Sequence, residues 1–126
     1  MSRRTVLVAV KSVDDIAVRS VDYAERIPAA IHEAVHAGGT DDFDRWSEEV
    51  PDLALEVVGG ADVAETLAET VRIKLDSRSV QEVVLVLARR RPFDADGTTL
   101  RAIVRRCGLI RGAVPIVLPP PGWSRP

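Results

Sequence analysis

The fold is decided by one continuous apolar run, EVVLVLA, at Glu82–Ala88, which is the most hydrophobic stretch of the chain. A strand that is buried on both faces has such an unbroken, valine-rich sequence, whereas a half-exposed strand alternates apolar and polar residues. A shorter run of the same type, TVLVAV, lies at Thr5–Val10. Both runs predict central strands of a parallel sheet, and we expect the two strands to be neighbours.

Three further segments predict the other strands. The composition of Ala30–Ala37 fits a strand or a helix, but Gly38-Gly39 ends the segment at strand length, so we interpret it as a strand. Leu53–Val58 predicts another strand. Ala113–Leu118 is the last, and Pro115 within it favours an edge of the sheet because proline cannot donate to a strand ladder.

The segments between these strands predict helices. Ser12 can cap a first helix that continues to Pro28, and Asp14 and Asp15 suit its first turn. Gly108 can end the last helix. The second and third helices are expected at Asp41–Glu49 and Asp62–Leu75, and the last one at Thr98–Cys107. Strands that alternate with helices predict an α/β, three-layer, flavodoxin-like (Rossmann-like) domain with five parallel strands in the order 3-2-1-4-5.

Size and composition are those of one globular domain. The chain has 126 residues, of which 46% are hydrophobic. We expect the domain to span residues 1–118 and a proline-rich tail to follow at 119–126. Cys107 is the only cysteine, which excludes an internal disulfide and suits a reducing compartment. No apolar run reaches the roughly 20 residues that span a bilayer, so we expect a cytoplasmic protein without membrane insertion.

Charge is distributed unevenly along the chain. Residues 41–76 contain eleven acidic and three basic residues, whereas residues 89–111 contain seven arginines and two aspartates. The formal net charge is −2, and duplex DNA binding requires a basic domain. We therefore expect no nucleic-acid partner, but an anionic small ligand beside the arginines is compatible with this pattern.

The candidate binding site lies where the strand order reverses, between the first and fourth strands. Ligands of open parallel sheets bind outside the carboxyl ends of the strands at such a point. The two loops that meet there carry Lys11, Ser12, Arg89, Arg90 and Arg91, which we predict to surround an anion such as a phosphate. The alternative is that the three arginines form a solvated surface loop, and the sequence does not decide between the two.

Two histidines are the other candidate ligands. His32 and His36 lie on one face of the second predicted strand, but metal sites need three or more arranged ligands and no third residue suggests itself. We therefore expect no metal. His36 is nearer the carboxyl end of the strand, where it lines the cleft or makes a hydrogen bond to the backbone. Cys107 lies on the apolar face of its predicted helix and is assigned to the core.

A phosphoacceptor receiver domain is excluded by the ends of the third and fifth strands. Asp14 and Asp15 follow the first strand, as acidic residues do in receivers. A receiver also needs an aspartate and a lysine at the other two ends, where this chain has Val58-Gly59-Gly60 and Leu118-Pro119. No nucleophile elbow, Walker loop, GxGxxG fingerprint or Ser-His-Asp pattern occurs, so we predict neither an enzyme nor a cofactor.

Three segments carry a resemblance to a known family. They are Thr5–Val10 with the turn that contains Ser12, Ile31–His36, and Val114–Leu118. In order and spacing they resemble the universal stress protein family over nearly the whole chain, which implies nucleotide binding and a stress-response role. ATP-binding members carry a glycine-rich segment and an aspartate where this chain has Arg89–Thr98 and Lys11, so ATP held in the family's manner is not implied.

A closer resemblance is to the universal-stress-like cytosolic tails of amino-acid and potassium permeases. It rests on a helix like Val18–Ile27 and on Phe43-Asp44-Arg45-Trp46 before the third strand. The resemblance implies a non-enzymatic regulatory domain that senses a nucleotide or cyclic di-AMP and regulates a membrane transporter.

The alternative function is a protein-interaction module without a ligand. An apolar edge strand pairs readily with another chain. We therefore expect Ala113–Leu118 to pair with its twofold mate and form a homodimer.

Overall fold

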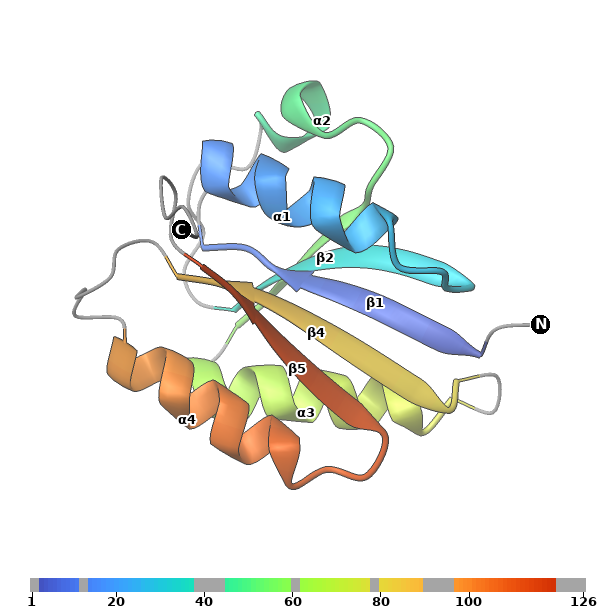
Figure 1. Ribbon diagram of the computed structural model, residues 1–126, viewed down its shortest axis with the longest axis vertical. Coiled ribbons are helices and arrows are strands. Elements are labelled where there is room, and N and C mark those ends of the chain that lie inside the picture. Colours follow the sequence, from blue (N-terminus) through green and yellow to red (C-terminus); the bar gives the residue numbers. More distant parts are fainter. Residues whose placement is uncertain are drawn as a thin grey trace, which may run out of the picture.

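A five-stranded, all-parallel sheet in the order β3-β2-β1-β4-β5 forms the centre of the computed structural model (Figure 1). The structure describes residues 3–11, 14–37, 45–59, 62–77, 80–89 and 97–119. The strands are β1 (Arg4–Ala9), β2 (Ile31–Ala37), β3 (Leu55–Val58), β4 (Glu82–Ala88) and β5 (Ala113–Leu118). The predicted α/β class, strand order and edge position of the last strand are confirmed.

Helices cover both faces of the sheet. The helices are α1 (Asp15–Glu25), α2 (Trp46–Glu49), α3 (Val63–Leu75) and α4 (Gly97–Gly108). In Figure 1, α1 and α2 lie on one face, and α3 and α4 lie side by side on the other. The third and fourth predicted helices agree with the structure to within one residue at each end.

The predicted start of the first helix needs correction. The first helix is capped by Asp14, whose Oδ1 accepts a hydrogen bond from the Ala17 N–H at 3.0 Å, so Ser12 is not the cap. A carboxylate at this position also interacts favourably with the helix dipole. α4 ends at Gly108, as predicted, and the left-handed conformation that favours glycine is found at Gly112, where φ is 93°.

The second predicted helix is described only at its end. α2 comprises four residues, Trp46–Glu49, and positions 41–44 of the prediction lie outside the described residues. The tail at 120–126 is also outside them.

The core has two apolar layers, one on each face of the sheet. Even-numbered residues of β1 and β4, such as Val6 and Val86, pack with α1. Odd-numbered residues, such as Leu7 and Leu85, pack with α3 and α4. All four are at most 1% exposed. The unbroken apolar runs are therefore explained by burial on both faces.

Pro115 costs the sheet no hydrogen bond. Val83 N–H donates to the Gly112 carbonyl at 2.9 Å, and Arg89 N–H donates to the Leu118 carbonyl at 3.0 Å. Because main-chain groups of a parallel strand alternate in direction, the even-numbered residues of β5 face β4 and Pro115 faces away from it. The missing N–H of proline thus falls on the open edge.

Among the described helices, none has both the length and the apolar character needed to cross a membrane.

Candidate functional site

The candidate site lies at the carboxyl ends of β1 and β4, where the strand order reverses. α1, the helix that follows β1, lies on one face of the sheet, and α4, the helix that follows β4, lies on the other (Figure 1). Val8 is paired with Val86. Lys11 follows the end of β1 by two residues, and Arg89 directly follows β4. Two cationic residues from adjacent strands therefore flank the point at which ligands of open α/β sheets bind.

The two cations differ in their surroundings. Lys11 is exposed, whereas Arg89 is half-buried. The main chain of Arg89 is held by the hydrogen bond to the Leu118 carbonyl, which ties the end of β4 to the end of β5. The predicted site residues Ser12, Arg90 and Arg91 lie outside the described residues.

The amino end of α1 already carries a negative charge. The Asp14 carboxylate accepts the Ala17 N–H, and Asp15 is in the first helical turn. These carboxylates offset the positive end of the helix dipole. Among the described residues, an anion at this site would therefore depend mainly on Lys11 and Arg89 for attraction.

His36 is a buried residue that contacts the backbone just before Lys11. It is 5% exposed, and its Nδ1 lies 2.7 Å from the Val10 carbonyl oxygen. Because a carbonyl oxygen only accepts, Nδ1 carries the hydrogen. The predicted hydrogen bond to the backbone is confirmed, and it fixes the residue that precedes Lys11. Contact between His36 and a ligand stays a prediction.

The two histidines lie apart in the described structure. His32 Nε2 lies 2.8 Å from the Ile27 carbonyl oxygen, so this ring is engaged at the other end of β2. Among the described residues, no three His, Cys, Asp or Glu side chains are grouped so that they could hold a metal ion.

Cys107 belongs to the core, as predicted. Its side chain is fully buried beneath α3 and α4, in the cluster that contains Leu67, Val71 and Ile103. Burial raises the pKa of the Cys107 thiol, and the positive charge of Arg72 opposes this effect in part. The thiol is therefore protonated at neutral pH and is a poor nucleophile.

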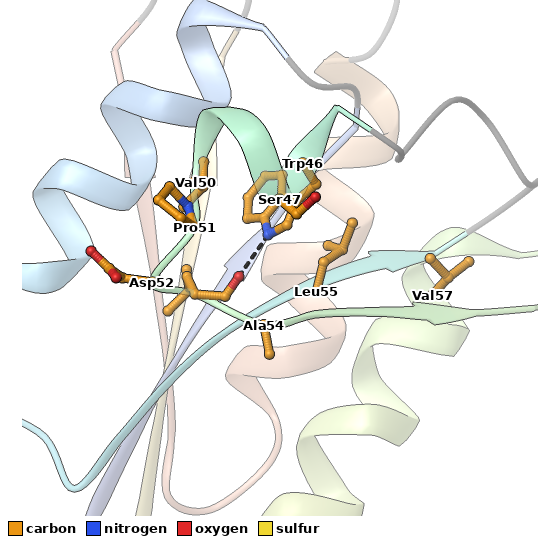
Figure 2. A pocket seen from close by; sticks show the side chains of 9 residues that line it. Trp46, Ser47, Val50, Pro51, Asp52, Ala54, Leu55 and Val57 are labelled. Atoms are coloured by element: carbon orange, nitrogen blue, oxygen red, sulfur yellow. Dashed lines mark hydrogen bonds between the residues drawn. The ribbon is translucent and has the colours of Figure 1, made fainter.

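The sequence reasoning missed an apolar groove beside β3. The groove has a volume of about 440 Å³ and is lined by residues of α2, of the following turn and of β3 (Figure 2). Trp46 is 5% exposed, and its indole N–H donates to the Leu53 carbonyl at 2.7 Å. The aromatic residue before Pro51 was visible in the sequence, but this contact between α2 and the segment before β3 was not.

Comparison with protein-family models and with curated proteins finds no match for this chain. The universal stress protein resemblance therefore stays a prediction.

Proposed function

We propose that this chain is a cytoplasmic, non-enzymatic regulatory domain of universal stress protein type, which binds a nucleotide or cyclic di-AMP at the carboxyl ends of β1 and β4. One observation carries the proposal. The strand order reverses between β1 and β4, and the register brings Lys11 and Arg89 to the same end of these two strands. Guanidinium and ammonium groups are the side chains that recognise phosphate.

The chemistry of the described residues at the candidate site favours sensing over catalysis. Lys11 and Arg89 supply positive charge, whereas the Asp14 carboxylate is engaged as a helix cap. The Nδ1 of His36 is committed to the Val10 carbonyl. General acid–base catalysis needs a titratable group within hydrogen-bond reach of the reacting atoms. The Asp14 carboxylate is engaged at the helix end, and the His36 ring is only 5% exposed, so it offers little surface to a substrate.

Ligand binding is tested by thermal unfolding. The purified protein is heated with ATP, AMP, cyclic AMP, cyclic di-GMP or cyclic di-AMP, with and without Mg²⁺. A ligand at 100 times its Kd stabilises the native state by about 2.7 kcal/mol, which raises Tm by several degrees. No shift with any of the five compounds would contradict the proposal.

The position of the site is tested by charge reversal. We expect the double variant Lys11→Glu, Arg89→Glu to lose the ligand in titration calorimetry, because two of the predicted phosphate-binding cations become anions. The matched control is Arg111→Glu, an exposed arginine just before the amino end of β5, at the opposite end of the sheet. Unchanged affinity in the double variant would place the ligand elsewhere.

Regulation of a membrane transporter is the second half of the proposal and needs a separate experiment. Immobilised protein is incubated with detergent-solubilised membranes, with and without the ligand found above, and the retained proteins are identified by mass spectrometry. Retention of a transporter that depends on the ligand supports the proposal. Retention of the same membrane proteins by a control column that carries the denatured protein would contradict it.

A homodimeric interaction module is the second candidate function. On the edge strand β5, Val114 and Val117 are 40% and 37% exposed. α1 packs against β1, β2 and β4, and β5 packs mainly against β4 and α4. Val114 therefore offers apolar surface to a twofold mate. Because Pro115 provides no outward N–H, this dimer would depend on side-chain packing more than on a continuous ladder.

A further inference from the structure

The open edge of β3 lies beside the apolar groove. β3 is the first strand of the sheet order, so only β2 pairs with it in the described structure. Leu55 and Val57 line the groove, and Figure 2 shows their side chains on the same side of β3 as Trp46. A strand added to this edge would therefore run along the groove.

In the described part of the structure, the β3 backbone has groups that point away from β2, toward the position of such a strand. Ala34 N–H donates to the Ala54 carbonyl at 2.9 Å, which fixes the direction of the ladder between β2 and β3. By the alternation of a parallel strand, the main-chain groups of Leu55 and Val57 then point away from β2. This edge offers N–H and C=O groups at both positions.

The groove offers apolar surface to the side chains of an added strand. Val57 is 43% exposed, and Leu55 is half-buried. Trp46 forms a rigid wall because its indole is held by the Leu53 carbonyl. Apolar side chains on alternate residues of an added strand would pack against these three residues.

The charges beside the edge are acidic. Asp52 lines the groove, and Glu48 is exposed on α2. Glu56 is exposed and lies between Leu55 and Val57, so its side chain is on the other face of β3. The nearby cation Arg45 is paired with Glu49 at 3.4 Å. Opposite charges on neighbouring strands attract, so residues beside Glu56 would be basic.

We propose that the β3 edge and its groove bind an extended segment of a partner protein in which apolar residues alternate with lysine or arginine. The apolar residues occupy the groove, the basic residues face Glu56 on the other side, and the backbone extends the sheet. This is strand addition, a common mode of peptide recognition. The proposal is independent of the anion site between β1 and β4.

The opposite edge of the sheet is less suited to strand addition. On β5, the outward position Pro115 has no N–H, and Ala113 N–H already donates to the Ile110 carbonyl at 3.1 Å. Proline on an edge strand is a common protection against pairing. β3 carries no proline between Leu55 and Val58.

The test measures fluorescence anisotropy of a labelled peptide, Gly-Arg-Val-Arg-Val-Arg-Gly, with the full chain. We expect saturable binding, and no binding of the acidic counterpart in which glutamate replaces arginine. Val57→Pro removes one outward N–H without touching the ladder to β2. It should weaken binding about tenfold or more, because one backbone hydrogen bond is lost and the proline ring also obstructs the edge. The matched control, Val117→Pro, removes an outward N–H of β5 and should leave binding unchanged.

A second variant keeps the proposal testable if Val57→Pro does not fold by circular dichroism. Glu56→Lys should weaken binding of the basic peptide severalfold and increase binding of the acidic one. Equal binding of the basic peptide by wild type and by both variants would show attraction to acidic surface in general and overturn the proposal. Absence of binding to wild type would also overturn it. So would a wild-type dimer that Val57→Pro converts to a monomer, because the edge would then be occupied by a second copy.

Discussion

Thr5 places a hydroxyl group in the interior of the sheet. Its side chain is 1% exposed, and in the described part of the structure Oγ1 has no hydrogen-bond partner. A buried polar atom without a partner costs about 1–3 kcal/mol of desolvation. We expect Thr5→Val, which keeps the shape of the side chain, to raise the free energy of unfolding by about 1 kcal/mol in urea titrations.

Thr70 provides the control for this experiment. It is 5% exposed, but its hydroxyl donates to the Thr66 carbonyl at 2.9 Å. Thr70→Val should therefore be neutral or destabilising by about 0.5–1.5 kcal/mol. A Thr5→Val variant that is less stable than the wild type would contradict the interpretation of Thr5.

The burial of Cys107 predicts that labelling of its thiol depends on pH differently in the native and in the unfolded protein. Burial raises the pKa of the Cys107 thiol above its ordinary value, so at a given pH the native state contains less thiolate than the unfolded state. We expect iodoacetamide to label the native protein only at higher pH than it labels protein in urea. The measurement is the labelled fraction by mass spectrometry against pH. Equal labelling rates at pH 8 in both states would contradict it.

At the scale of elements, the turn from α4 to β5 depends on one glycine. Gly112 has a φ of 93°, and a Cβ atom there would lie 2.9 Å from the Gln81 carbonyl oxygen and 3.1 Å from the Leu75 Cδ2. A side chain would therefore be strained by both its backbone conformation and its neighbours. We expect Gly112→Ala to lower the free energy of unfolding by about 1–3 kcal/mol in urea titrations.

Gly108 tests whether this effect is specific to Gly112. It lies at the end of α4, and a Cβ atom there would meet nothing within 4 Å. Gly108→Ala should be neutral or stabilising by about 0.4–1 kcal/mol, because alanine restricts the unfolded chain. Similar losses in both variants would mean that the positive φ is not what Gly112 contributes.

The elements differ in how well their sequences predicted them. The central strands β1 and β4 were predicted to within one residue, because burial on two faces leaves an unbroken apolar pattern. The start of α1 was placed at Ser12 instead of Asp14, because several neighbouring residues were suitable caps and local hydrogen bonds decide among them. The candidate site stays a prediction. Its position follows from strand order, but the burial of His36 depends on the register between β1 and β2.

At the scale of the whole molecule, the exposed β5 edge predicts a dimer. Light scattering after size-exclusion chromatography should give twice the 13.7 kDa chain mass at micromolar concentration. Val114→Arg should give a monomer with an unchanged circular dichroism spectrum, because it places a charge on the packing surface.

Leu109→Arg is the matched control for the dimer. Leu109 is 84% exposed and precedes β5, so this variant should remain dimeric. A monomeric wild-type protein at micromolar concentration would contradict the dimer and leave β5 as a solvent-exposed edge.

The sequence by itself determined the α/β class, the parallel sheet, the order of its strands and the edge position of β5. These properties follow from local signals, namely apolar runs, helical periodicity and proline, which act over a few residues. Only the tertiary structure decided which contacts are made at the two edges of the sheet and at the candidate site. The Trp46–Leu53 hydrogen bond, the outward direction of Leu55 and Val57, and the link from His36 to Val10 each depend on backbone register or on a contact between elements. Such contacts are set by packing of the whole chain, because the partners become neighbours only when the sheet has formed.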